Sequence, residues 1–121
     1  SNQASVQSRD EQLAKVIQEG NLNVLNLNLS GADNNATVVQ RGSQNEYNLS
    51  LDGIENELTI LQEGDANKVT QTFDNADGLE IELIQFGSGH EIIQMGGGNA
   101  DSPIQVVQQG SPMKVVIEKK N

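Results

Sequence analysis

The fold follows from the stretch Val16-Ile17-Gln18-Glu19-Gly20-Asn21-Leu22-Asn23, whose pattern returns along the chain. The repeated glutamine recurs at spacings of 22, 22, 23 and 23 residues, at Gln18, Gln40, Gln62, Gln85 and Gln108. A glycine stands two positions after each glutamine, at Gly20, Gly42, Gly64, Gly87 and Gly110. The position three residues further on holds Asn23, Asn45, Asn67, His90 and Met113. Columns shared by five copies at nearly constant spacing indicate a repeat architecture.

Apolar residues alternate with others on both sides of each glycine. Before the glutamines, the alternating positions are Ala14/Val16, Ala36/Val38, Leu58/Ile60, Ile81/Leu83 and Ile104/Val106. After the glycines, they are Leu25/Leu27, Tyr47/Leu49, Val69/Gln71, Ile92/Gln94 and Val115/Ile117. A period of two predicts strands with one buried face, whereas a helix would show an apolar period of about 3.6. The chain is therefore predicted to be all-β, and each repeat is a strand, a tight glycine turn, a second strand and a looser return.

One such unit cannot bury its own apolar side, so the repeats must stack on one another. Strands of successive repeats then pair in parallel and in register about 4.8 Å apart, and two such sheets face each other across the core. This arrangement is a β-solenoid of five strand-turn-strand rungs. We expect the rungs at about residues 12–33, 34–55, 56–78, 79–101 and 102–121, after a flexible segment over residues 1–11.

The stacking also explains the inward amides. A buried amide is costly unless its polar groups are satisfied, and identical amides on successive rungs can satisfy one another. We expect one ladder of the five repeated glutamines and a shorter ladder of Asn23, Asn45 and Asn67. The repeated glycines are expected to supply a positive φ or a close backbone approach at the corner. The alternative interpretation is that the amides are ordinary polar residues beside turns.

The composition narrows the classes of function. The chain has 121 residues with 14 Asn, 13 Gln, no Cys and a formal net charge of −10. The acidic balance argues against binding to nucleic acid, and no apolar run is long enough to insert in a membrane. No catalytic, metal-binding or cofactor-binding pattern is found, and the single histidine, His90, falls in the asparagine column, where we expect a structural role. An enzyme is not expected.

The outward positions carry two further patterns. An apolar residue precedes each repeated glutamine and forms an outward apolar stripe: Ile17, Val39, Leu61, Ile84 and Val107. Soluble proteins rarely expose such a stripe, so we expect lateral packing, either between two solenoid filaments or against the N-terminal segment. The alternative is that these residues reflect only local strand propensity. Charges of opposite sign also follow one another in the columns Glu19/Arg41/Glu63 and Glu46/Lys68/Glu91/Lys114.

The two ends of a solenoid leave strands with unpaired backbone groups. The sequence shows no cap at the first rung, and Pro103 and Pro112 offer only partial capping of the last. Addition of the fifth rung of one chain to the first rung of the next is a heterologous contact that does not close, so it produces fibres. We therefore expect end-to-end stacking into a cross-β amyloid fibre.

These repeats resemble the curlin repeat of curli, the functional amyloid of bacterial biofilms, which has the form Ser-x5-Gln-x4-Asn-x5-Gln with a Gly two residues after the first Gln. The Gln-x-Gly-x2-Asn part is intact at residues 18–23, 40–45 and 62–67. The second Gln is replaced by Leu29, Leu51 and Phe73, and His90 and Met113 interrupt the asparagine column. The resemblance covers residues 12–118.

The resemblance implies a secreted subunit of extracellular, cell-surface fibres that serve biofilm matrix and adhesion. It further implies as partners other copies of the chain, a nucleator or other curli subunit, and an outer-membrane export pore addressed by residues 1–11. The departures leave open whether the chain is a major subunit, a nucleator or a divergent relative. Another alternative is a monomeric β-solenoid binding module, which would need a flat array on one face. In this chain Thr37 and Thr59 share a column that other residue types interrupt.

Overall fold

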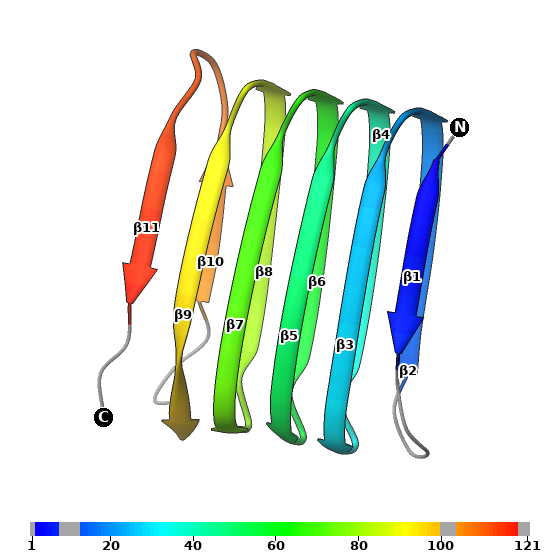
Figure 1. The fold of residues 1–121 in the computed structure, drawn as a ribbon. Coiled ribbons are helices and arrows are strands. Elements are labelled where there is room, and N and C mark those ends of the chain that lie inside the picture. The colour runs from blue at the N-terminus through cyan, green and yellow to red at the C-terminus, as the bar shows by residue number, and fades with distance from the viewer. Residues whose placement is uncertain (1, 8–12, 100–103, 119–121) are drawn as a thin grey trace.

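The computed structural model describes residues 2–7, 13–99 and 104–118, which wind into a β-solenoid (Figure 1). Sheet A contains β1 (Gln3–Gln7), β3 (Val24–Ala32), β5 (Glu46–Ile54), β7 (Lys68–Asp77), β9 (Glu91–Asn99) and β11 (Lys114–Glu118). Sheet B contains β2 (Leu13–Asn21), β4 (Asn35–Ser43), β6 (Glu57–Asp65), β8 (Glu80–Ser88) and β10 (Ile104–Gln108). Neighbouring strands within each sheet are parallel. The predicted all-β solenoid with two parallel sheets is confirmed.

The strands stack in the register that the repeat predicts. Gln40 lies beside Gln18 on one side and beside Gln62 on the other, and the remaining positions of these strands follow one for one. One irregularity lies in β7, whose register shifts against both neighbours: between Leu51 and Gly53 of β5, and between Asp74 and Ala76 opposite β9, which leaves Asn75 without a partner position. This bulge takes up the additional residue of the third repeat, so the strands on either side keep their alignment.

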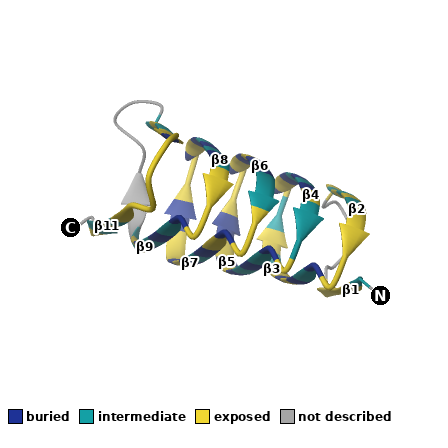
Figure 2. Ribbon diagram, turned by 90° about the horizontal axis from the view of Figure 1, so that it is seen from above, coloured by how far each residue is buried: buried dark blue, intermediate teal, exposed yellow. Residues whose placement is uncertain are grey.

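The two sheets face each other, as the view from above shows (Figure 2), and the buried residues of both sheets form one core cluster. Along the central strands buried and exposed residues alternate, because successive side chains of a strand point to opposite faces. The buried apolar residues are Leu25, Leu27, Leu29, Ala36, Val38, Tyr47, Leu49, Leu51, Leu58, Ile60, Val69, Phe73, Ala76, Leu79, Ile81, Leu83 and Ile92. Leucine and isoleucine therefore supply most of the core that the few aromatic residues cannot fill.

The corners of the solenoid differ from prediction in one respect, because the first return is as tight as the glycine turns. Gly20 has φ of 106°, and Gly31, in the return 11 residues later, has φ of 101°. A Cβ on either glycine would lie 1.9 Å from the carbonyl oxygen of the glycine on the next rung. Both corners therefore require glycine for its φ and for close stacking, and a rung consists of two similar halves.

The N-terminal segment also differs from prediction. Residues 1–11 were expected to be flexible, but Gln3–Gln7 form β1, which pairs in parallel with β3. The reason is that Asn2 lies in the register position next to Asn23, so this short stretch continues the solenoid by half a turn. Residues 1 and 8–11, like Pro103 and Lys119–Lys120, lie outside the described residues.

Candidate functional site

The most regular polar feature of the molecule is the glutamine ladder inside sheet B. The side chain of Gln18 donates from Nε2 to Oε1 of Gln40 over 2.8 Å. The same bond joins Gln40 to Gln62, Gln62 to Gln85, and Gln85 to Gln108, each over 2.9 Å. The bonds all run in one direction, so the ladder has a donor end at Gln108 and an acceptor end at Gln18.

Each glutamine also ties the two sheets together. The second N–H of Gln40 donates to the carbonyl oxygen of Val24 over 2.9 Å, and that of Gln62 donates to the carbonyl oxygen of Glu46 over 2.9 Å. The buried members of this ladder, Gln40, Gln62, Gln85 and Gln108, therefore each use both N–H groups as donors. No buried side-chain polar atom among the described residues lacks a hydrogen-bond partner, which is what an amide-rich core requires for stability.

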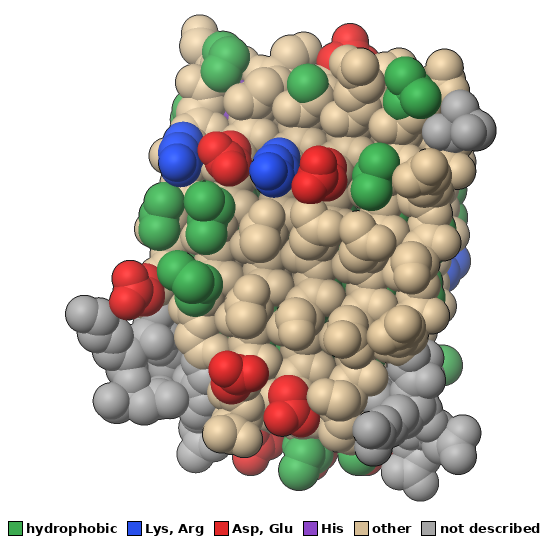
Figure 3. All heavy atoms as spheres, viewed as in Figure 1, with side chains coloured by type: hydrophobic (Ala, Val, Ile, Leu, Met, Phe, Trp, Pro, Cys, Tyr) green, Lys and Arg blue, Asp and Glu red, His purple; other side chains and the backbone are tan. Residues whose placement is uncertain are grey.

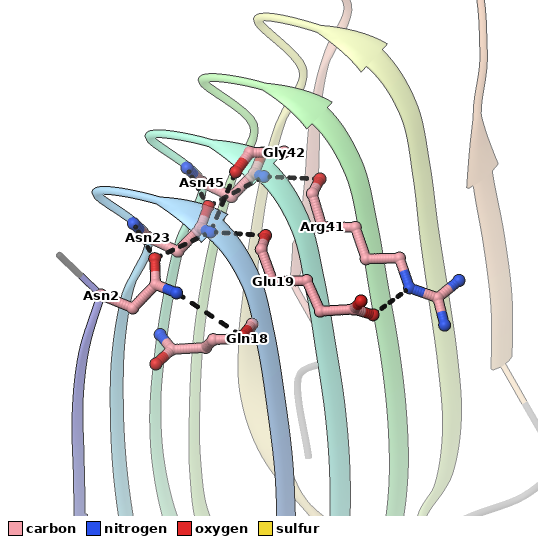
Figure 4. Close-up of polar contacts among 7 residues, drawn as sticks. All are labelled: Asn2, Gln18, Glu19, Asn23, Arg41, Gly42 and Asn45. Atoms are coloured by element: carbon pink, nitrogen blue, oxygen red, sulfur yellow. Dashed lines mark hydrogen bonds and ion pairs between the residues drawn. The ribbon is translucent and has the colours of Figure 1, made fainter.

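The asparagine ladder lies at the corner that follows each repeated glycine (Figure 4). Both the backbone N–H and Nδ2 of Asn45 donate to Oδ1 of Asn23 over 3.1 Å. Its Nδ2 also donates to the carbonyl oxygens of Arg41 and Gly64. The backbone N–H of Asn67 continues the ladder by donating to Oδ1 of Asn45 over 3.1 Å. Asparagine fits this position because one short side chain provides the acceptor and the donors that the corner needs.

Sequence reasoning missed a second asparagine ladder at the opposite corner. Nδ2 of Asn56 donates to Oδ1 of Asn34 over 2.9 Å, and Oδ1 of Asn56 accepts the backbone N–H of Leu79 over 2.8 Å. Both asparagines are buried. The signal was present in the sequence, since each follows a glycine by three residues, as Asn23 follows Gly20.

His90 replaces asparagine in the first ladder and reproduces its hydrogen bonds. The ring is fully buried, and its backbone N–H donates to Oδ1 of Asn67 over 3.1 Å. Nδ1 accepts the backbone N–H of Met113 over 3.2 Å, and Nε2 lies 2.7 Å from the carbonyl oxygen of Phe86. These partners assign the neutral tautomer with the proton on Nε2. The ladder ends at Met113, whose side chain offers no comparable acceptor.

Sheet A holds a further buried polar group that was not predicted as a ladder. Nε2 of Gln71 donates to Oε1 of Gln94 over 2.8 Å, and Oε1 of Gln71 accepts the hydroxyl of Tyr47. Burial raises the pKa of the Tyr47 hydroxyl well above its ordinary value, so the group remains a donor. The alternation of the sequence placed both glutamines inward, but it did not indicate the diagonal contact with the tyrosine.

The predicted charge columns form on the surface, where the alternating signs are visible over sheet A (Figure 3). Two close ion pairs are present among the described residues. Nε of Arg41 lies 2.9 Å from Oε1 of Glu19, and Nζ of Lys114 lies 3.9 Å from Oε1 of Glu91. Such exposed pairs contribute only a few tenths of a kcal/mol, so their main effect is to disfavour wrong registers.

The outward apolar stripe lies on the outer face of sheet B. Ile17 and Val107, at its two ends, are 37% and 48% exposed, and the three residues between them are half-buried. The suggestion that the N-terminal segment covers the stripe is wrong for residues 3–7, because β1 pairs at the edge of sheet A. Packing of the stripe between two filaments stays a prediction.

The N-terminal end of the solenoid is formed by β1 and β2, and the C-terminal end by β10 and β11 (Figure 1). Asn2 completes the asparagine ladder at the first end. Its Oδ1 accepts the backbone N–H of Asn23 over 3.0 Å and Nδ2 of Asn23 over 3.1 Å, and its own Nδ2 donates to the carbonyl oxygen of Gly20 over 3.3 Å. At the C-terminal end, Gln108 donates to the carbonyl oxygens of Glu91 and Met113.

A hollow on sheet B is lined by Glu57, Thr59, Glu80, Ile81, Glu82, Ile104 and Gln105. No group of three or more metal-ligating side chains that could hold an ion occurs within residues 2–7, 13–99 and 104–118. In the same ranges no helix is long and apolar enough to cross a membrane.

The fold and its ladders define a parallel β-solenoid with an internal amide scaffold. No family model matches the chain, and neither a curated protein nor a solved structure is significantly similar to it. The class therefore rests on the geometry described above.

Proposed function

We propose that this chain is a structural subunit of an extracellular fibre of the curli type, which assembles head to tail by extending its own solenoid. The observation that carries the proposal is the directional ladder, which stops at Gln108 at one end and at Gln18 at the other. Nε2 of Gln108 donates to the carbonyl oxygens of Glu91 and Met113 and to no further glutamine, and in a joint between copies this donor would exchange the Met113 oxygen for the Oε1 acceptor of Gln18. A second copy in the same orientation would place that acceptor next to that donor.

The backbone supports the same contact. Strands β10 and β11 are the last strands of their sheets, so each has one edge without a neighbouring strand among the described residues. A strand from a second copy that paired in parallel with either edge would place its side chains beside side chains of similar size, because each rung repeats the one before it. The contact is heterologous and does not close on itself, so repeated addition gives a filament with a strand spacing of about 4.8 Å.

The biological setting comes from the resemblance to the curlin repeat. By that resemblance the subunit is secreted through an outer-membrane pore, and its fibres lie at the cell surface, where they serve biofilm matrix and adhesion. Other copies of the chain are the main partners, together with a nucleator or another curli subunit.

A second candidate is an accessory subunit that starts or ends fibres. The observation that favours it is Met113, which interrupts the asparagine ladder at the C-terminal end. A contact through that end would lack one acceptor that every internal rung possesses, so addition there is weaker than a perfect continuation of the solenoid.

The test is to dilute denatured, purified chain into buffer and to follow thioflavin fluorescence, sedimentation and fibre diffraction. We expect unbranched fibres with a meridional spacing of about 4.7–4.8 Å, and fragments of them should seed fresh chain. A chain that remains a soluble, β-rich monomer at all concentrations would overturn the proposal. Fibres that form only in the presence of seeds from another subunit would favour the accessory role.

A further inference from the structure

The two sheets contain unequal numbers of strands, and this affects how copies can stack. Sheet A has six strands and sheet B has five, because β1 adds to sheet A without a counterpart in sheet B. The further inference rests on the proposed function, since it concerns the joint between copies. In a continuous solenoid both sheets advance by the same strand spacing on every turn.

Stacking with β1 in place would leave a defect. If β11 of one copy paired with β1 of the next, then β10 and the next β2 would be two strand spacings apart, or about 9.6 Å. One strand would be missing from sheet B, and Gln108 would be too far from the next Gln18 for a hydrogen bond. The glutamine ladder and the backbone pairing of sheet B would both break at each joint.

Stacking without β1 would remove the defect. The strand β11 of one copy would pair with β3 of the next, and β10 would pair with β2, so that both sheets continue. Gln18 now donates to the carbonyl oxygen of Gln3 over 2.9 Å. By register, the carbonyl oxygen of Lys114 of the second copy would take that place, because Gln3 and Lys114 share a column.

Several features of β1 favour its release from β3. All five of its residues are exposed, whereas β3 and β5 each bury several side chains completely. Its side chains add little to the core, since Val6 remains 43% exposed. Its backbone pairs only with β3 among the described strands.

We propose that β1 is a displaceable cap: it occupies the edge of β3 in the free chain and leaves it when β10 and β11 of a second copy dock on β2 and β3. The cap and the second copy compete for the same backbone groups of β3, so fibre growth requires release of β1. The surface is the paired edge of β2 and β3, and its partner is the C-terminal rung of another copy of this chain.

One acceptor is not replaced in this exchange, and two hydrogen bonds to it are lost. Asn2 supplies the acceptor for the backbone N–H and Nδ2 of Asn23, and the residue that would take its place in the second copy is Met113. The missing acceptor favours the capped state, so the cap slows growth even though the second copy contributes two strands. Replacement of Met113 by asparagine should restore the acceptor at the joint.

A disulfide that holds β1 on β3 tests the proposal directly. Ser5 and Asn26 are register partners and both are exposed, and the chain has no cysteine of its own. Neighbouring strands lie within the Cα separation of about 4.4–6.8 Å that disulfides span. The variant Ser5→Cys/Asn26→Cys should form no fibres when oxidised, and reduction of the same sample should restore fibre formation. The matched control Asn48→Cys/Thr70→Cys joins β5 to β7 in the same outward column and should form fibres in both states.

The outcomes separate the two proposals. Fibre growth by oxidised Ser5→Cys/Asn26→Cys at the wild-type rate would overturn the cap while the fibre function stands. Failure of wild type and control to form any fibre would overturn the function and the cap with it.

A second measurement addresses Met113. The variant Met113→Asn should lower the soluble concentration that remains at the end of assembly about fivefold, as one additional ordinary hydrogen bond per joint would. The control Met95→Asn changes an exposed methionine of β9, which lies one strand back from the docking strand β11 and outside the asparagine column, and it should leave that concentration unchanged. Equal concentrations for Met113→Asn and wild type would show that Met113 does not face Asn23 of a second copy, which overturns the proposed joint.

Discussion

The glutamine ladder can be tested by replacing its central member, Gln62, with leucine. Leucine is of similar size and keeps the position apolar and filled, so the substitution removes the amide with little change of volume. Three hydrogen bonds are lost: the one from Gln40, the one to Gln85, and the one to the carbonyl oxygen of Glu46. The variant therefore measures what the ladder contributes to the folded state.

The expected magnitude follows from the groups left without partners. One N–H of Gln40 loses its acceptor, and Oε1 of Gln85 loses its donor, and both side chains are fully buried. A buried polar group without a partner costs about 1–3 kcal/mol, so Gln62→Leu should lower the free energy of unfolding by about 2–6 kcal/mol. This is a large share of the stability of about 5–15 kcal/mol that is usual for a domain.

The assay is urea denaturation of freshly refolded, dilute chain, followed by circular dichroism. The matched control is Gln105→Leu, which makes the same change at an exposed position on strand β10. The control should change the free energy of unfolding by less than about 0.5 kcal/mol, as surface substitutions generally do. An equally small effect of Gln62→Leu would refute the reasoning, because the buried amides would then contribute nothing.

A double variant sharpens the test. In Gln40→Leu/Gln62→Leu the orphaned groups are one N–H of Gln18 and Oε1 of Gln85, which is the same number as in either single variant. The double variant should therefore cost about as much as one single variant, about 2–6 kcal/mol, and not the sum of two. Strict additivity would show that the amides act independently and not as a ladder.

Three further outcomes are expected. Gly42→Ala should lower the free energy of unfolding by at least about 1–2 kcal/mol more than Gly110→Ala does. Both glycines have a positive φ, but only at Gly42 would a Cβ meet a carbonyl oxygen, at 2.0 Å. Equal urea midpoints for the two variants would contradict this. His90→Asn should leave the free energy of unfolding unchanged, whereas His90→Leu should lower it by about 1–3 kcal/mol, because leucine cannot replace the polar contacts of the ring. An equal loss of stability in both variants would show that the ring acts only by packing. Burial raises the pKa of the Tyr47 hydroxyl, so the stability that this hydroxyl contributes is complete below the ordinary tyrosine pKa of about 10 and is lost as the pH rises above that value. Urea titrations at increasing pH should show this loss of stability in wild type and not in the variant Tyr47→Phe.

Much of the candidate site could be predicted because the repeat places like residues on successive rungs. Once Gln18 and Gln40 are aligned, a parallel in-register sheet leaves their side chains no position other than side by side. The tight return at Gly31 and the ladder through Asn34 were missed for a different reason. The return was interpreted from its loop-like composition, and its likeness to the other corner becomes evident only when both are seen to carry the same backbone turn.

Local substitutions were harder to interpret from the sequence. His90 was correctly placed in the asparagine column, but its use of both ring nitrogens depends on the distances to Phe86 and Met113. The contact between Tyr47 and Gln71 joins two different columns, so no pattern within one column could indicate it. Such diagonal contacts depend on side-chain length and direction, which a period of two does not specify.

The sequence by itself determined the period, the direction of stacking and the inward face of each strand, because these depend on local alternation and on a repeat that occurs five times. The tertiary structure alone decided what happens at the ends. Residues 3–7 carry too short a pattern to predict a strand, and they form β1 only because β3 offers an edge and Asn23 offers donors to Asn2. The unequal strand count of the two sheets follows from that pairing, since an edge can be matched to a strand only after both are placed in space.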